Sequence, residues 1–314
     1  MHQWSSLKYY NMQEQSHNNG FFARNTRKQV RSADFSCVPA GLKFLSVLLF
    51  ASCFFAACYE SQEGCRDIAA TNFDASADKD CDCCTYPNLQ IGVSQHYDTE
   101  TYIENKVYLA SDGHPFILKN VSFYLSDFQL FQNGTAYTVS DTAGLYTFSQ
   151  AGNDTLREIF TDDFILVRRT PLVNAAGTFR NDGVFDRIEF RIGLDDNAER
   201  VIPSRAPAGH PLRTQSDSLW HGRTEGFVFM QVVVARDTFA GTKPDTISLK
   251  RADLNNAIFS AAGSFKHETG YNFNIVLDVD HKKLLDGIDW TTGDISAWKS
   301  RIVSNLPGAL SVTQ

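Results

Sequence analysis

The chain has 314 residues, of which 43% are hydrophobic, so it holds enough apolar material for one large folded domain or two smaller ones. Its formal net charge is −7. Residues 1–57 contain six basic and two acidic side chains, so the remainder has 23 basic and 34 acidic side chains and a net charge of about −11. Such a surface repels nucleic acid and anionic membranes, which excludes binding to either through charge.

Residues 1–40 are polar and basic and show no hydrophobic periodicity. A signal sequence normally begins within a few residues of the initiator, yet in this chain the segment that resembles one begins only at residue 41. Two interpretations stay open. The segment is a disordered leader, or translation starts near Val38 or Leu42 and the segment is a mis-annotated start.

Residues 41–57 have the layout of a bacterial lipoprotein signal peptide. Lys43 precedes an uncharged apolar run that ends at Ala56-Ala57-Cys58. The mature chain is therefore expected to begin at Cys58, carry lipid there and fold outside the cytoplasm. We expect it at the outer membrane, facing the periplasm or the cell surface. The alternative, a single transmembrane anchor, needs about 20 apolar residues to cross roughly 30 Å of hydrocarbon, and this run is shorter.

Residues 58–87 are rich in cysteine and aspartate and resemble a short repeat of bacterial surface proteins that begins with Gly-Cys-x-Asp. Four cysteines in an oxidising compartment indicate two disulfides with three possible connectivities, and a zinc site is the rival interpretation. The oxygens of the polar side chains in residues 64–84 are also candidate calcium ligands. The four cysteines are Cys65, Cys81, Cys83 and Cys84, and the oxygen donors are Asp67, Asn72, Asp74, Asp78 and Asp80.

Residues 88–314 are dominated by strand signals: alternating or solid apolar runs separated by turn residues. The apolar positions of residues 116–131 change phase between Leu125 and Phe128, which predicts a bulge or a bend. This pattern predicts an all-β fold, an antiparallel β-sandwich or barrel-like domain with few short helices. The other expected strands are 88–95, 163–168, 187–192, 226–234, 246–250 and 272–279.

Two short segments have helix signals instead of strand signals. They are residues 253–261 and residues 294–303, and Asp294 is the expected N-cap of the second.

No catalytic motif stands out in the sequence. It has no recognisable Ser-His-Asp frame, phosphate-binding glycine loop or His-Glu-x-x-His zinc motif. The acidic pairs Asp162-Asp163 and Asp195-Asp196 fall in turn-like positions without an obvious partner base, which argues against a hydrolase. Histidines remain, and imidazole is a common ligand of copper and zinc. They are His96, His114, His210, His221, His267 and His281.

Several segments, taken in order, resemble the MbnP-like copper-binding domain family of bacterial lipoproteins and surface proteins. The most recognisable is residues 116–130, with an aromatic pair followed by Leu-Ser-Asp-Phe-Gln-Leu. The others are residues 93–96, 188–195, 210–229 and 265–275.

The resemblance implies a β-sandwich that binds one copper ion through histidines and has no catalytic activity. His96 and His267 lie in the matching segments and are the expected ligands, with Asp98 and Glu268 as the carboxylates that orient them. It also implies a di-haem cytochrome c peroxidase-like partner that oxidises a tryptophan. Trp220 is the corresponding modified or site-lining aromatic. The alternative function is a surface lipoprotein β module that binds glycan or protein without metal.

Overall fold

The structure, a computed structural model, describes residues 60–314 except residue 140, residues 150–154 and residues 215–218. The predicted leader (1–40), the signal peptide (41–57) and the lipidation residue Cys58 lie outside the described residues and stay predictions. The chain divides into two units, residues 1–60 and 61–314, and all elements named below belong to the second. In the described part, no helix combines the length and the apolar character that a membrane crossing requires.

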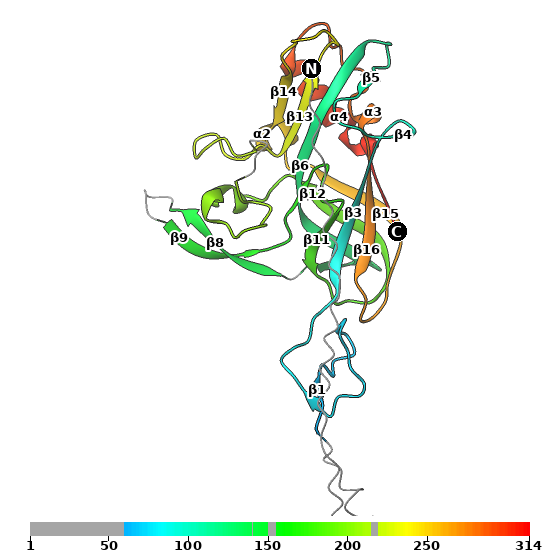
Figure 1. Cartoon of the computed structure of the whole chain (residues 1–314), viewed down its shortest axis with the longest axis vertical. Helices are drawn as coiled ribbons and strands as arrows, with labels where there is room; N and C mark the ends of the chain where they lie inside the picture. Colours follow the sequence, from blue (N-terminus) through cyan, green and yellow to red (C-terminus); the bar gives the residue numbers. More distant parts are fainter. Residues whose placement is uncertain (1–59, 140, 150–154, 215–218) are drawn as a thin grey trace, which may run out of the picture. The chain divides into compact units, whose positions relative to one another are not determined.

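Two β-sheets form the main body (Figure 1). A β-hairpin forms a further, separate two-stranded sheet. The larger sheet has the strand order β14 (Asp245–Leu249), β13 (Met230–Ala235), β6 (Pro115–Gln132), β12 (Gly183–Ile192) and β15 (Ile258–His267), and β6 also pairs with β5 (Val107–Leu109), β7 (Thr135–Thr138) and β10 (Ile165–Val167). The smaller sheet has the order β11 (Val173–Thr178), β3 (Asn88–Tyr97), β16 (Phe273–Asp280) and β17 (Leu310–Thr313), with β4 (Glu100–Thr101) beside β3. The hairpin is β8 (Thr142–Phe148) and β9 (Thr155–Thr161).

The predicted all-β sandwich is confirmed, and neither sheet closes into a barrel over the residues described. All pairings in the larger sheet are antiparallel, whereas β3 and β16 pair in parallel. This pairing brings the first and one of the last strands of the domain side by side.

Aromatic side chains join the two sheets in the core. Phe185 of β12 packs against Phe273 of β16 with ring centroids 5.7 Å apart, and Phe179 contacts both rings. Leu89 and Ile91 of β3 are buried on the same inner face because alternate residues of a strand point to the same side.

The predicted phase change in residues 116–131 is a bulge in β6. Asp127 adopts a φ of 56°, and the register with β12 shifts at this point. The backbone N–H of Phe128 is left without a ladder partner and donates to the buried Asp163 carboxylate at 3.0 Å. The bulge lets Leu125 and Phe128 both face the core, which a regular strand would not allow.

Helices are short except for one: α2 (Arg251–Leu254), α3 (His281–Leu284) and α4 (Ile295–Ala309), with 3-10 turns at Ala198–Arg200 and Pro203–Arg205. Asp294 caps α4 as predicted, accepting from the N–H groups of Ser296 and Ala297. The helix predicted over residues 253–261 is wrong beyond Leu254. Asn255 and Asn256 adopt positive φ, which ends the helix, and β15 begins two residues later.

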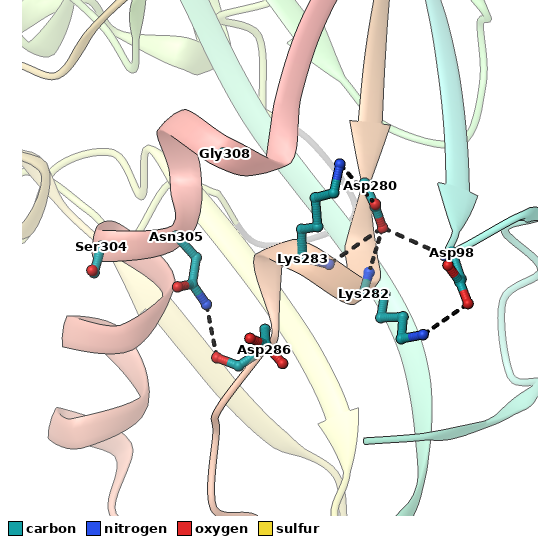
Figure 2. A pocket seen from close by; sticks show the side chains of 8 residues that line it. All are labelled: Asp98, Asp280, Lys282, Lys283, Asp286, Ser304, Asn305 and Gly308. Carbon is teal, nitrogen blue, oxygen red and sulfur yellow. Dashed lines mark hydrogen bonds and ion pairs between the residues drawn. The ribbon is translucent and has the colours of Figure 1, made fainter. Parts of the chain in front are cut away.

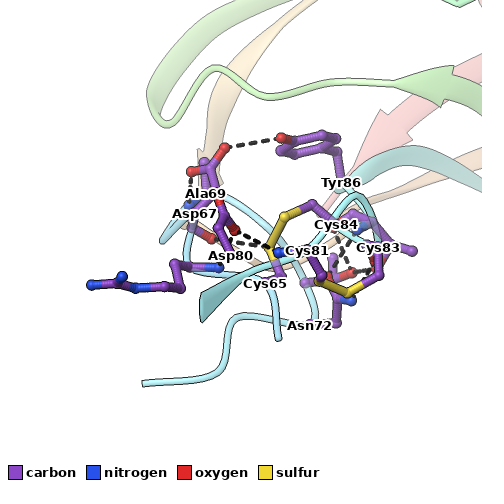
Figure 3. Close-up of a disulfide and its surroundings, with 12 residues drawn as sticks. Cys65, Asp67, Ala69, Asn72, Asp80, Cys81, Cys83, Cys84 and Tyr86 are labelled. Carbon is purple, nitrogen blue, oxygen red and sulfur yellow. Dashed lines mark hydrogen bonds between the residues drawn. A yellow bond between two sulfur atoms is a disulfide. The ribbon is translucent and has the colours of Figure 1, made fainter. Parts of the chain in front are cut away.

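The four cysteines of residues 58–87 form two disulfides, Cys65–Cys84 and Cys81–Cys83 (Figure 3). All four sulfurs are paired, so the zinc interpretation is wrong. Over residues 60–87 the module has only the two-residue strands β1 (Glu63–Gly64) and β2 (Lys79–Asp80), and disulfides replace the core that so short a segment cannot build.

The calcium prediction for residues 64–84 finds no support. The Asp67 carboxylate accepts from the Ala69 N–H and the Tyr86 hydroxyl, and Figure 3 shows Asp67 directed toward Tyr86. The Asp74 carboxylate likewise accepts from Ser76. These carboxylates cap local turns, and no three His, Cys, Asp or Glu side chains are grouped to hold an ion in the described part of the module.

Candidate functional site

A polar concave region of the smaller sheet lies where β3 and β16 end and α3 begins. The parallel register places His96 of β3 opposite Asp280 of β16. A cavity of about 480 Å³ opens beside them (Figure 2). It is lined by Asp98, Asp280, Lys282, Lys283, Asp286, Ser304, Asn305 and Gly308.

His96 has a carbonyl on one ring nitrogen and a carboxylate on the other. Its Nδ1 lies 2.5 Å from the backbone oxygen of Asp98, and its Nε2 lies 2.7 Å from Oδ2 of Asp278. A carbonyl oxygen only accepts, so Nδ1 carries a proton and Nε2 faces the carboxylate. Burial by itself lowers the pKa of His96. The hydrogen bonds to Asp278 and Asp98 and the charges of Asp278 and Asp280 outweigh burial and raise that pKa above its ordinary value.

The Asp280 carboxylate caps the N-terminus of α3. Its Oδ1 accepts from the backbone N–H groups of Lys282 and Lys283, at 3.0 and 3.2 Å, and lies 4.0 Å from Nδ1 of His96. The side chain of Lys282 reaches toward Asp98 and that of Lys283 toward Asp280, as Figure 2 shows. Lys282 Nζ lies 2.7 Å from Asp98 Oδ2, and Lys283 Nζ lies 3.6 Å from Asp280 Oδ2. The cavity therefore has both signs of charge.

His281 is fully buried directly after Asp280. Its Nε2 lies 3.0 Å from Oε1 of Gln95, and its ring meets Tyr102 edge-on. Burial, with a smaller contribution from the charge of His96, lowers the pKa of His281 to about 3, so the ring is neutral. Its Nδ1 has no hydrogen-bond partner among the described residues. Sequence reasoning gave His281 no role, because only the fold shows that it is buried.

His267 lies at the opposite end of the smaller sheet from His96. It ends β15, and its ring stacks on Phe273, the first residue of β16, whereas His96 is level with the last residue. Seven residues of strand at about 3.3 Å each separate the two levels by roughly 23 Å. The structure therefore does not bring the two predicted ligands together.

The surroundings of His267 also differ from those of His96. The His267 ring is buried, and its two nitrogens lie 2.6 Å from the Asn181 oxygen and 2.8 Å from the Tyr271 oxygen. Two backbone carbonyls thus occupy both ring nitrogens. Glu268, the expected orienting carboxylate, instead pairs with Lys266 at 2.7 Å. His267 ties the turn before β12 to the β15–β16 hairpin.

A family model, MbnP, matches residues 86–300, which is more than half of the chain. The chain belongs to the MbnP family. Among solved structures, MbnP from Methylosinus trichosporium is similar, with 12% identity and a TM-score of 0.40, over 71% of this chain and 97% of that one. A comparison with curated proteins finds no match. The expected family is thereby confirmed.

Trp220 of this MbnP-family chain is half-buried and packs on Phe227, with ring centroids 4.7 Å apart. A backbone bridge joins the same two residues. The other tryptophans of the domain, Trp290 and Trp298, are buried in the core. The described contacts of Trp220 are those of a packing residue.

The MbnP-family domain does not present a complete metal site in its described part. No three His, Cys, Asp or Glu side chains there are grouped so as to hold an ion. His96 and Asp278 together supply two donors, one imidazole and one carboxylate. The expected two-histidine site is not formed by His96 and His267 in this arrangement.

Proposed function

We propose that this chain is a lipid-anchored, extracytoplasmic protein that binds one copper ion without catalysing a reaction, and that His96 is its principal ligand. The family match over residues 86–300 carries the proposal, since the MbnP family is associated with copper. The finer assignment to His96 depends on the geometry at the end of β3.

The hydrogen bonds of His96 suit a metal ligand. Metal-binding histidines usually donate the second ring N–H to a carbonyl or carboxylate, which fixes the tautomer. The Asp98 carbonyl takes this part at Nδ1 and leaves Nε2 directed at Asp278. Imidazole nitrogen with carboxylate oxygen is a donor set that suits Cu(II). Asp278 is the second donor in this proposal, and the remaining positions are open to water.

The expected location and partner belong to the same proposal. Lipid on Cys58 would hold the chain at the outer membrane, facing the periplasm or the cell surface. Two disulfides in residues 61–87 support an oxidising compartment. A di-haem cytochrome c peroxidase-like partner, acting on Trp220, is the interaction that the family resemblance suggests. The intact mass of the mature chain tests it, because an oxidised indole changes that mass.

Copper stoichiometry tests the proposal. Wild-type mature protein and three variants, His96→Ala, Asp278→Asn and His221→Ala, are loaded with Cu(II), desalted and analysed for metal. His221 is exposed and serves as the matched control. We expect about one copper per chain in wild type and in the His221 variant, and loss of copper in the His96 variant.

Two results contradict the proposal in different ways. If His96→Ala retains copper while folded, the ligand assignment is wrong. If wild type retains none, copper binding itself is wrong, and the metal-free surface module becomes the better interpretation.

A further inference from the structure

A second cavity, of about 400 Å³, lies between β11 and the ends of the β8–β9 hairpin, away from His96. Asp141 directly precedes β8 and Asp162 directly follows β9, so the hairpin places both residues side by side in the lining of this cavity. His210, from the turn after the second 3-10 helix, also lines the cavity. Phe164, Pro171 and Val173 provide apolar wall.

A bulge in β11 lets the two acidic segments approach the strand. Gly177 adopts a φ of 136° at the register shift between β11 and β3. A Cβ atom at this position would lie 2.5 Å from the Val139 side chain. It would lie 3.2 Å from Asp141 Oδ2 and 3.2 Å from the backbone oxygen of Asp162. A side chain here would collide with Val139, so the bulge beside the cavity requires glycine.

His210 directs an unsatisfied N–H into this region. Its side chain is only 6% exposed, and its Nδ1 accepts from the Leu212 N–H at 3.1 Å, so the ring proton of the neutral tautomer is on Nε2. Nε2 lies 3.2 Å from Asp162 Oδ1 but makes no aligned hydrogen bond among the described residues. The fold thus brings a histidine beside Asp162, but as a hydrogen-bond donor and not as a base.

This tautomer argues against a metal ion on His210. A neutral imidazole needs an unprotonated nitrogen to coordinate a metal, and the unprotonated Nδ1 already accepts from the backbone. His210 therefore acts as a hydrogen-bond donor in the cavity.

The charge of the lining selects the complementary ligand. Asp141 and Asp162 face the cavity, and its described lining includes no lysine or arginine. One oxygen of Asp141 accepts from the Thr178 N–H, whereas Asp162 is about one-third exposed. A cationic N–H donor satisfies the carboxylates, an oxygen acceptor next to it satisfies His210, and an apolar body covers the wall.

We propose that this cavity binds a primary ammonium group that has a neighbouring oxygen acceptor and an apolar substituent. Free amino alcohols and the N-terminus of a peptide both have this chemistry. The proposal is independent of copper binding at His96.

Calorimetric titration of the mature protein with matched probes tests it. The probes are 2-amino-1-phenylethanol, phenethylamine without the oxygen, 1-phenylethanol without the charge, and the peptide amide Phe-Gly-Gly-NH2. We expect the amino alcohol to bind about tenfold tighter than 1-phenylethanol and more tightly than phenethylamine. The ratio of peptide to amino-alcohol affinity identifies the source of the ammonium.

Isosteric variants locate the site. Asp162→Asn and Asp141→Asn are each expected to weaken amino-alcohol binding about tenfold, whereas Asp82→Asn, at an exposed position of the disulfide module, leaves it unchanged. Thermal unfolding confirms that each variant folds. Equal affinity for charged and neutral probes, absence of binding by both the amino alcohol and the peptide, or unchanged binding in both folded cavity variants overturns the proposal.

Discussion

The buried Asp163 makes the stability of the domain depend on pH. Its side chain is 4% exposed and holds the β6 bulge by accepting from Phe128 N–H. Burial raises the pKa of Asp163 to about 7, and the charges of Asp127 and Asp195 add to this, although the backbone N–H of Phe128 opposes it. The carboxyl group is therefore protonated in the folded protein at pH values where it is ionised in the unfolded chain.

The sign and the size follow from linkage. A group whose pKa is raised on folding stabilises the protein fully below its unfolded pKa, and this contribution is lost as pH rises through its folded pKa. For Asp163 the interval runs from 3.8 to about 7. The difference corresponds to about 4 kcal/mol of unfolding free energy lost across the interval. In a domain of this size about 1 kcal/mol changes Tm by roughly 3 °C, so the loss corresponds to roughly 12 °C.

Asp163→Asn removes this titration while keeping an oxygen that accepts from Phe128. We expect the Tm of wild type to fall between pH 3.5 and pH 8 relative to that of the variant, with the two curves diverging by up to roughly 12 °C. Calorimetric unfolding at half-unit pH steps measures this, with exposed Asp82→Asn as the control. Parallel curves for wild type and Asp163→Asn would refute the reasoning, because they would show that Asp163 ionises equally in both states.

The remaining predictions concern the fold. Gly193→Ala places a Cβ against the ring of Phe229 and puts an alanine at a φ of 121°. Thermal unfolding should therefore show a loss of about 3 kcal/mol in unfolding free energy, and an unchanged Tm contradicts this. Asp294→Ala removes the α4 cap and should cost about 1 kcal/mol by urea unfolding. The double change of Cys65 and Cys84 to serine opens a loop of sequence separation 19 and should destabilise residues 61–87 by about 3 kcal/mol, seen as faster amide exchange there.

The strands that could be predicted were those with strong local patterns. Residues 88–95 alternate regularly and form β3, and the phase change in residues 116–131 is the β6 bulge. Several strands were missed, among them β8, β9, β11, β15 and β17. β15 reads Ile-Phe-Ser-Ala-Ala-Gly-Ser-Phe-Lys-His, where small residues hide the alternation, and its stability comes from pairing with β12. Tertiary pairing overrides weak propensity in such segments.

The candidate site was only partly predictable, because strand direction decides which ends meet. His96 is the second-last residue of β3 in the smaller sheet, and His267 is the last residue of β15 in the larger sheet. The turn between β15 and β16 reverses the chain after His267, and β16 then runs parallel to β3. This carries the chain away from His267 before it reaches the level of His96. Local sequence contains no signal of that parallel register, so the two residues matched the family pattern in order without converging in space.

Three histidines that the sequence alone does not distinguish, His96, His210 and His267, differ in the hydrogen-bond partners of their ring nitrogens. In His96 a carbonyl accepts from Nδ1, so a neutral ring has its lone pair on Nε2, the position that the proposed metal ion would take in place of the proton shared with Asp278. In His210 a backbone N–H donates to Nδ1, so Nε2 has the proton and acts as a donor. In His267 the ring is buried and backbone carbonyls lie within hydrogen-bond distance of both nitrogens, so both ring nitrogens are used within the fold. The backbone partner of each ring, set by the local turn, thus determines which chemistry each histidine offers, and substitution of His96 alone should remove metal without affecting the cavity at His210.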